Sequence, residues 1–549
     1  MTCHGTLKKD PPDNMRLGKF GNSLAAFVES PFVLFCFALS VSAFCKLSRL
    51  DSRELWLDET YSAFVADLCF PELLRHTAGD VHPPLYYMLL WAWVRIAGDA
   101  QAQLRLFSVV LSICAAIGMF LLARRLLGSR SGAFAAVLFA LSPMLFVYSL
   151  EVRMYMLSLL IFICLLLVHW IAAVERSEDK WVVAAYGILA ALLFYVHYIG
   201  VFLLLGLFAH WTITTSFARG RIARLCAAGA LTIILISPGI PVLLEQHAGK
   251  AQMDQARTLS HRNPSALSFG VVERKPIGFA PMKGLAKSAA AMAGFYPAAS
   301  PLLLLLCAVP LAAALAGAGF LWLVRGDEVC RLAGIVMLAV GIGIVALHLY
   351  STRYMLPLVP LLILAIARAV QYGAAMPRWR IPSLAGGTLV LCLYASGFFR
   401  QAFIYHERPW QNLVSALQQN YRPGDRVVFD ALYAQVPFDY FARHLHFQPQ
   451  EDGFPISVYD WWKEQEFKGW GGPVILRSDL DEYTSGLSAS RPKTLWLVLD
   501  ETYYYDPHDA LLERLRQVGR VTEIRLPPDP DNPDSQNDEM LRLIRVSVN

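Results

Sequence analysis

The 549-residue sequence has few charged residues: Asp, Glu, Lys and Arg make up 17% of it, while 56% of the chain is hydrophobic. Soluble globular proteins average about 25% charged and about 45–50% apolar residues. Apolar runs of about 17 to 25 residues recur along the chain, and this length suits helices that cross a bilayer. The composition therefore excludes a set of ordinary soluble domains and predicts a polytopic membrane protein.

Other features that the sequence lacks narrow its function further. The ten cysteines end at Cys392, so the polar C-terminal part can form no internal disulfide. The chain has no internal repeat. It also has no glycine-rich phosphate loop of the kind that binds nucleotides, which argues against an enzyme whose substrate is activated by a nucleotide. Lys and Arg are spread over short loops, as the positive-inside bias produces, so we expect no nucleic-acid partner. No small-residue cleavage site follows the first apolar run, which we expect to be a retained helix.

Eleven membrane-spanning helices are predicted, and the polar residues 1–30 would precede them in the cytoplasm. Their approximate bounds are 31–47, 103–123, 132–149, 156–174, 181–196, 198–217, 225–244, 300–324, 332–350, 355–372 and 383–400. The predicted fold class is thus a polytopic α-helical membrane protein, with a membrane domain over residues 1–400 and the C-terminus outside.

The first external loop, residues 48–102, contains a short apolar segment at 85–98. As a helix this segment would be about 21 Å long, against a hydrocarbon core of about 30 Å, so we expect it to lie on or dip into the bilayer surface. This choice leaves Arg124 and Arg125 in the cytoplasm, as the positive-inside rule prefers. It also brings Asp58 and Glu151 to the same external side.

A second external interval is predicted at residues 245–298, ending in a short helix from Ala286 to Phe295. Residues 401–549 change to the composition of a soluble domain, which we predict to be a small external α/β layer. Its expected helices are Trp410–Tyr421 and Ala510–Val518, and its expected strands are Arg426–Phe429, Pro473–Leu476, Thr494–Leu499 and Met540–Val548, with a surface loop at 527–538.

Two adjacent carboxylates, Asp58 and Glu59, follow the first span. Sugar transfer needs a base that takes the proton of an acceptor hydroxyl, and a carboxylate near the membrane face suits that task. We therefore predict Asp58 as the catalytic base. The alternatives are a solvated loop acid or a helix N-cap, and Glu59 is expected to be a supporting neighbour.

The stretch Asp80-Val81-His82-Pro83-Pro84 leads into the short apolar segment. The prolines fix the backbone, and an imidazole held at the interface could donate a hydrogen bond to a phosphate. His82 is therefore a predicted phosphate-binding residue, with an ordinary loop histidine as the alternative, and Asp80 is a supporting candidate.

Charged residues also interrupt two later apolar stretches. Glu151 and Arg153 lie between predicted spans, where a charged pair is costly unless it faces a wet cavity or is paired internally. We predict Glu151 as a second catalytic acid and Arg153 as a phosphate ligand; a pair that only positions helices is the alternative. Arg353, beside Tyr354, has the forked donors that suit a lipid phosphate, although it could equally be a snorkelling arginine. The turn at 197–198 is a weaker external candidate.

We see no metal-binding motif and expect no cofactor. A divalent cation held through the oxygens of Asp58, Glu59 and Glu151 is an open alternative that nothing in the sequence requires.

Four motifs, taken in order, resemble those of the GT-C glycosyltransferases. They are Asp58-Glu59, His82-Pro83-Pro84-Leu85-Tyr86-Tyr87, Glu151-x-Arg153-Met154-Tyr155 and Arg353-Tyr354-x-Leu356-Pro357. The branch they resemble most comprises bacterial relatives of protein O-mannosyltransferases and of the aminoarabinose transferases that modify lipid A, over about residues 50–400. The resemblance implies a polyprenyl-phosphate sugar donor, a catalytic acid in the first external loop and inversion at the anomeric carbon.

Carried onto this chain, the resemblance makes Asp58 the base and places Glu151 in the second acidic loop. Arg353 stands in the late loop that contacts the lipid phosphate. His82 stands where the aminoarabinose transferases have a phosphate-binding lysine, so its charge should depend on pH. That departure leaves the donor head group and the sugar open.

The sequence as a whole therefore predicts a glycosyltransferase of a bacterial inner membrane with a periplasmic C-terminal domain. Its partners would be a polyprenyl-phosphate-linked sugar, membrane lipids and a lipid, glycan or protein acceptor. The alternative is a transporter or flippase of a lipid-linked sugar. Transporters usually carry repeats and midplane sites, whereas these charged residues gather at one external face. A structural subunit with an external binding domain is the third reading.

Overall fold

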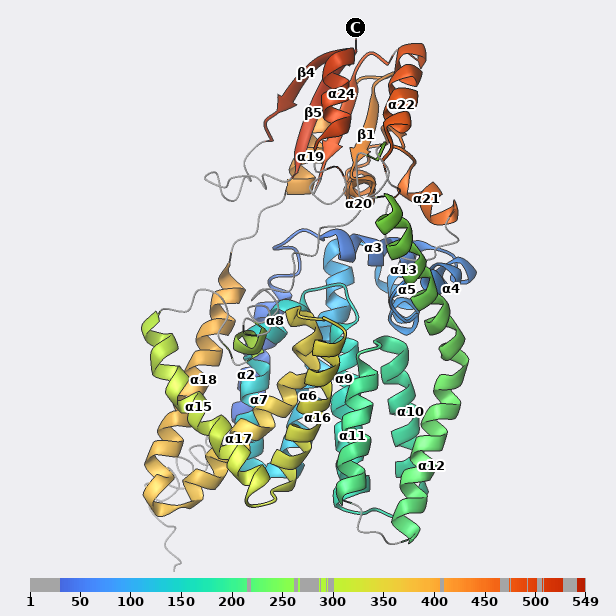
Figure 1. The fold of residues 1–549 in the computed structure, drawn as a ribbon. Coiled ribbons are helices and arrows are strands. Elements are labelled where there is room, and N and C mark those ends of the chain that lie inside the picture. The colour runs from blue at the N-terminus through green and yellow to red at the C-terminus, as the bar shows by residue number, and fades with distance from the viewer. Residues whose placement is uncertain are drawn as a thin grey trace, which may run out of the picture.

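The chain folds into a bundle of long helices with a C-terminal region stacked on one end of it, as the computed structural model in Figure 1 shows. The described residues are 30–214, 219–260, 265–266, 286, 288–292, 294, 301–404, 409–464, 473, 475–490, 492–500, 506, 508–526 and 541–548. The predicted tail up to residue 29, much of the interval 245–298 and the predicted loop 527–538 lie outside this description.

The bundle is formed by α-helices with short 3-10 or π-helical turns between some of them. The helices are α2 (Pro31–Leu47), α6 (Gln101–Leu127), α7 (Ser129–Ala140), α8 (Pro143–Ser149), α9 (Tyr155–His169), η1 (Trp170–Val174), α10 (Lys180–Val196), α11 (Gly200–Thr214), α12 (Arg219–Ile236), η2 (Ser237–Gly239), α13 (Ile240–Ser260), α15 (Pro301–Leu323), α16 (Glu328–Ala346), η3 (Thr352–Leu358), α17 (Val359–Ala375), η4 (Pro377–Trp379) and α18 (Arg380–Phe403).

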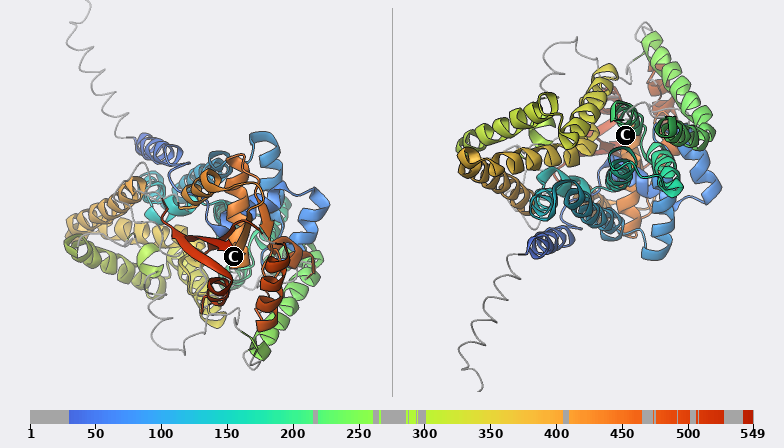
Figure 2. Two further views of the ribbon diagram at one scale, coloured as in Figure 1. Left: turned by 90° about the horizontal axis from the view of Figure 1, so that it is seen from above. Right: turned by 90° about the horizontal axis from the view of Figure 1, so that it is seen from below.

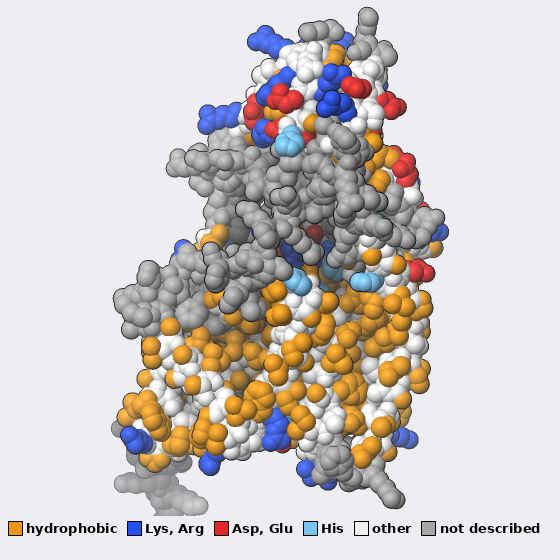
Figure 3. Space-filling view, in the orientation of Figure 1, with side chains coloured by type: hydrophobic (Ala, Val, Ile, Leu, Met, Phe, Trp, Pro, Cys, Tyr) orange, Lys and Arg blue, Asp and Glu red, His pale blue; other side chains and the backbone are white. Residues whose placement is uncertain are grey.

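Among the described residues, six helices are long and apolar enough to cross a membrane, and the bent pair α7–α8 would make a seventh. Shorter apolar helices, including α2, α10 and α11, stand among them. In Figure 3, hydrophobic side chains form a broad band over the bundle, with charged side chains above and below it. The chain is thus an integral membrane protein. Each predicted span overlaps a described helix, but the count of eleven crossings stays a prediction.

The predicted span 132–149 is not straight. Helices α7 and α8 meet at an angle of 52° around Leu141 and Ser142. Pro143, the first residue of α8, has no N–H to continue the hydrogen-bond ladder of α7, so the first helix ends there. The Ser142 hydroxyl accepts a hydrogen bond from the Leu145 amide instead and starts the next helix.

Three short helices lie across the end of the bundle that faces the C-terminal region (Figure 1): α3 (Leu57–Asp67), α4 (Phe70–Gly79) and α5 (Leu85–Ala97). The loop expected around Asp58 is therefore largely helical. Asp58 and Glu59 form the first turn of α3, where a carboxylate interacts favourably with the helix dipole. The Trp56 amide donates to Glu59 Oε2 over 3.3 Å, which closes that turn.

The C-terminal region, residues 409–548, holds a five-stranded sheet in the order β2-β1-β3-β5-β4. Strands β1 (Arg426–Asp430), β2 (Gln450–Asp452) and β3 (Leu495–Leu499) are parallel, and β5 (Arg542–Val548) runs antiparallel to β3 and to β4 (Gly519–Ile524). Its helices are α19 (Pro409–Asn420), η5 (Leu432–Ala434), α20 (Gln435–His444), α21 (Val458–Glu464), α22 (Arg477–Ser490) and α24 (Ala510–Val518). Its position outside the membrane stays a prediction.

One predicted strand is wrong. Leu476 forms only an isolated bridge to Ala266, and the helix α22 begins at the next residue. The reason is local: the Asp479 carboxylate accepts a hydrogen bond from the Leu476 amide over 2.7 Å, which is helix-capping geometry. Viewed along the bundle in Figure 2, the C-terminal region lies over the side that carries α3 to α5 and leaves α15 and α18 uncovered.

Candidate active site

Asp58 lies where three distant parts of the chain meet. Arg353 Nη1, from η3, is 3.2 Å from Asp58 Oδ2, and Arg153 Nη2, from the turn before α9, is 3.9 Å from the same oxygen. Asp58 is 9% exposed. The structure therefore brings together a predicted base and two predicted phosphate ligands that are separated by up to 295 residues in sequence.

Arg153 is held rigidly beneath α3. It is 1% exposed and donates to the Asp58 carbonyl (3.2 Å), the Ser62 hydroxyl (3.4 Å) and the Tyr87 hydroxyl (3.3 Å). Its Nε is buried and has no hydrogen-bond partner in the part of the chain that the structure describes. A fixed guanidinium with a donor to spare suits an anionic ligand better than it suits a purely structural ion pair.

Arg353 is less confined than Arg153. Its side chain is 34% exposed, its Nε donates to the Ser351 hydroxyl over 3.2 Å, and its guanidinium carbon lies 5.5 Å from the centre of the Trp56 ring. About a third of the Arg353 side chain is therefore accessible to solvent beside Asp58.

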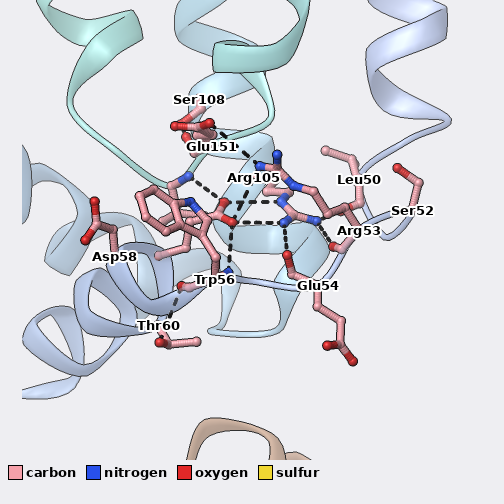
Figure 4. Close-up of polar contacts among 12 residues, drawn as sticks. Leu50, Ser52, Arg53, Glu54, Trp56, Asp58, Thr60, Arg105, Ser108 and Glu151 are labelled. Atoms are coloured by element: carbon pink, nitrogen blue, oxygen red, sulfur yellow. Dashed lines mark hydrogen bonds and ion pairs between the residues drawn. The ribbon is translucent and has the colours of Figure 1, made fainter. Parts of the chain in front are cut away.

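Glu59 is fully buried. Figure 4 shows the polar network around its partner Arg105, with Arg53 and Glu54 nearby. The Glu59 carboxylate lies 3.1 Å from Arg105 Nη2 and accepts a hydrogen bond of 2.9 Å from the Val152 amide. The second contact ties the Glu151–Arg153 turn to α3. These contacts fit the supporting role predicted for Glu59.

Glu151 lies beside this network at 8% exposure. Its carbonyl accepts from the Ser108 hydroxyl over 2.6 Å, and Arg53 Nη2 is 3.9 Å from its carboxylate. Burial raises the pKa of Glu151 to about 7, against the opposing pull of Arg53. The carboxyl group is thus partly protonated near neutral pH and could exchange a proton there.

Two histidines and a tyrosine form a neighbouring group. The rings of His82 and His197 have centres 5.8 Å apart, and those of His197 and Tyr354 are 6.0 Å apart. Burial, reinforced by Arg153, His197 and Arg353, lowers the pKa of His82 well below its usual value. His82 is therefore neutral at physiological pH, so the pH-dependent charge expected there does not apply to this arrangement. A neutral imidazole can still donate one hydrogen bond.

His197 belongs to this group although the sequence marked it only as a weaker candidate. The Ile199 amide donates to His197 Nδ1 over 3.2 Å, which places the proton of the neutral ring on Nε2. Burial also lowers the pKa of His197, to about 4. The sequence signal was the short polar turn between α10 and α11.

Asp80 supports the site from a distance. Its carboxylate accepts from the Val81 amide (2.6 Å) and from the Tyr87 hydroxyl (3.3 Å), and Tyr87 in turn contacts Arg153. Two further residues, Arg105 and Glu54, were not predicted to belong to the site. Arg105 is an arginine inside a predicted apolar span, and this was the signal that could have found it. Glu54 lies in a polar loop and carries no such signal.

Each carboxylate named as a possible ligand of a divalent cation lies beside an arginine. Asp58 is paired with Arg353, Glu59 with Arg105 and Glu151 with Arg53, at distances between 3.1 and 3.9 Å. Within the described ranges, no group of three or more His, Cys, Asp or Glu side chains could hold a metal ion. A reaction without a cofactor stays a prediction.

Comparisons with known proteins agree with this architecture. Residues 81–242 match the protein family described as "Dolichyl-phosphate-mannose-protein mannosyltransferase". No curated protein matches the sequence.

Solved structures match over nearly the whole chain. ArnT from Cupriavidus metallidurans in the apo state shares 14% sequence identity with a TM-score of 0.58, over 96% of this chain and 98% of that one. The same protein bound to undecaprenyl phosphate gives 13% identity and a TM-score of 0.54, over 93% and 98%. The Archaeoglobus fulgidus oligosaccharyltransferase tethered to an acceptor peptide gives 10% identity and a TM-score of 0.50, over 92% and 74%. The likeness predicted from the motifs is thus confirmed, and the chain has the fold of the GT-C glycosyltransferases.

Proposed function

We propose that this protein transfers a sugar from a polyprenyl-phosphate-linked donor to an acceptor hydroxyl at the external face of the membrane. The observation that carries the proposal is the meeting of one carboxylate, Asp58, with two guanidinium groups, Arg153 and Arg353. A base for the acceptor and a cationic pocket for the leaving phosphate are the two parts that such a transfer requires. The undecaprenyl phosphate named for the ArnT complex supports a lipid phosphate as the leaving group.

In the proposed reaction, the acceptor oxygen forms a bond to the anomeric carbon while its proton passes to Asp58. The bond between the anomeric carbon and the phosphate oxygen breaks, and its electron pair leaves with the polyprenyl phosphate. In-line attack of this kind inverts the configuration at the anomeric carbon.

The cationic groups act on the leaving side. The phosphate gains negative charge as the bond breaks, and fixed donors stabilise charge that develops in a dry site. Arg153 is fixed by its three hydrogen bonds, whereas the half-buried Arg353 can turn from Asp58 to the phosphate. That exchange frees Asp58 Oδ2 to accept the proton. His82 adds a further hydrogen-bond donor, and Glu151, with its pKa of about 7, is the second acid–base group at the site.

The test uses purified protein in detergent with labelled undecaprenyl-phosphate-mannose and undecaprenyl-phosphate-aminoarabinose, and an envelope lipid and glycan extract as acceptor. We expect Asp58→Asn to lower transfer by about 10²–10⁴-fold, the range for loss of a general base. Binding of undecaprenyl phosphate should persist, because the arginines remain. Transfer unchanged in Asp58→Asn would refute the role of Asp58. Donor binding by the wild type without turnover would favour a carrier of the lipid-linked sugar.

A further inference from the structure

The segment that leads into α3 is fixed by a single buried arginine. Arg105, which is 1% exposed, lies in the first turns of α6 and points into the bend of residues 50–59 (Figure 4). Its guanidinium donates to the carbonyls of Leu50 (3.0 Å), Arg53 and Glu54 (2.8 Å) and to the Glu59 carboxylate (3.1 and 3.4 Å). Because the fork of donors is planar and rigid, these contacts set the shape of the bend that precedes Asp58.

Glu54, in the same bend, contacts the first turn of α19 in the C-terminal region. Its two carboxylate oxygens accept hydrogen bonds from the amides of Trp410 (2.8 Å) and Gln411 (2.7 Å), in the first turn of α19. The first amides of a helix have no partner within the helix, and the dipole favours a negative charge there. Pro409, at the first position, has no amide to offer. Glu54 therefore caps the N-terminus of α19, although it lies 356 residues before Trp410 in the sequence.

The C-terminal region also covers the outer face of α3. Tyr61 and Phe64 lie 5.7 and 5.3 Å, between ring centres, from Trp462 of α21. Arg443 of α20 pairs with Asp67 over 2.8 Å. A cavity of about 100 Å³ remains between α3 and α20. An isolated helix shorter than about 12–15 residues is marginal in water, so α3, with 11 residues, depends on these contacts.

We propose that Glu54 and Arg105 are positioning residues, through which docking of the C-terminal region sets the position of Asp58. This inference rests on the proposed function. The path runs from the amides of α19 to the Glu54 carboxylate, from the Glu54 carbonyl to Arg105, and from Arg105 to Glu59 beside Asp58. The contacts of Glu54 with the Trp410 amide and of Arg105 with Glu54 and Glu59 join buried groups, and the contact with the Gln411 amide is partly buried. The C-terminal region is thus part of the catalytic apparatus without contributing a catalytic residue.

The test compares Glu54→Ala, Glu54→Gln and the control Glu513→Ala, which removes an exposed carboxylate from α24. Displacing a reacting group by about 1 Å can lower a rate by about 100-fold. We expect kcat to fall by about 10- to 100-fold in Glu54→Ala. Glu54→Gln should lie between it and the wild type, because the amide oxygen still accepts one hydrogen bond. The KM for the donor and the Kd for undecaprenyl phosphate should change by less than about twofold, because the arginines that face the phosphate do not contact Glu54.

The outcomes separate this inference from the function on which it rests. Wild-type protein without transfer activity would refute both the proposed function and the positioning role. An active wild type, with both Glu54 variants equal to the Glu513→Ala control, would overturn the positioning role alone. Equal losses in kcat and in undecaprenyl phosphate binding would also overturn it, because they would indicate general unfolding. Thermal unfolding of each variant identifies that case directly.

Discussion

The protonation of Glu151 gives a prediction that does not depend on the reaction. The pKa of this carboxyl group is raised from 4.5 to about 7, mainly because it is buried. Below pH 4.5 the group is protonated in both the folded and the unfolded chain, and its burial carries no penalty from charge. As the pH rises to 7, the unfolded chain releases the proton first, so stability falls, and above that range the penalty is constant. A shift of this size corresponds to about 3 kcal/mol.

Glu151→Gln should remove this penalty, because glutamine imitates the neutral acid and does not titrate. The free energy of unfolding of the variant, minus that of the wild type, should rise by about 3 kcal/mol between pH 4 and pH 8. Equilibrium unfolding of the detergent-solubilised proteins in denaturant, at several pH values, measures this difference. Glu513→Gln, at an exposed position on α24, is the matched control. A difference that stays flat across this range, or falls, would refute the assignment of a buried, partly protonated Glu151.

Further predictions concern the residues proposed to bind the phosphate. Arg353→Ala should weaken undecaprenyl phosphate binding by about 10- to 100-fold, since a charge-assisted hydrogen bond contributes about 1.5–3 kcal/mol. Arg353→Lys should restore only part of the lost affinity. An unchanged affinity, measured by calorimetry, would mean that Arg353 pairs with Asp58 and does not bind the phosphate. Burial is the main cause of the low pKa of His82, and the charges of Arg153 and Arg353 lower it further. A bound phosphate offsets the charges of these arginines, so binding should take up protons and tighten as the pH falls. His82→Gln should reduce the proton uptake measured by titration calorimetry in two buffers; an uptake equal to that of the wild type would assign it to another group.

The sequence was most informative where the chemistry is local. Charged residues that interrupt apolar runs indicated Glu151 and Arg353, because charge is costly in such places. The two adjacent carboxylates after the first span indicated Asp58. Apolar runs of suitable length indicated where the spanning helices lie. The helix Ala510–Val518 coincides with its predicted bounds because its amphipathic pattern, which buries Leu511, Leu512 and Leu515, is local in the sequence.

The sequence could not predict which distant residues each of these side chains contacts. Glu59 and Asp58 are adjacent, yet one is buried against Arg105 and the amide of Val152, while the other faces Arg353. Those partners lie 46, 93 and 295 residues away, so no local pattern separates the two acids. The neutral state of His82 depends in the same way on burial by distant helices.

The contact between Glu54 and α19 uses only main-chain amides of the C-terminal region. Because the Glu54 carboxylate accepts hydrogen bonds only from backbone amides, the contact does not depend on side chains. Any helix that begins at this point can supply those amides. This contact therefore places almost no constraint on the side chains of α19, whereas the contacts of Trp462 and Arg443 with α3 do depend on side chains. A chimera that joins this bundle to a foreign C-terminal region should keep α3 in place when the first helical turn after residue 408 is preserved together with Trp462 and Arg443.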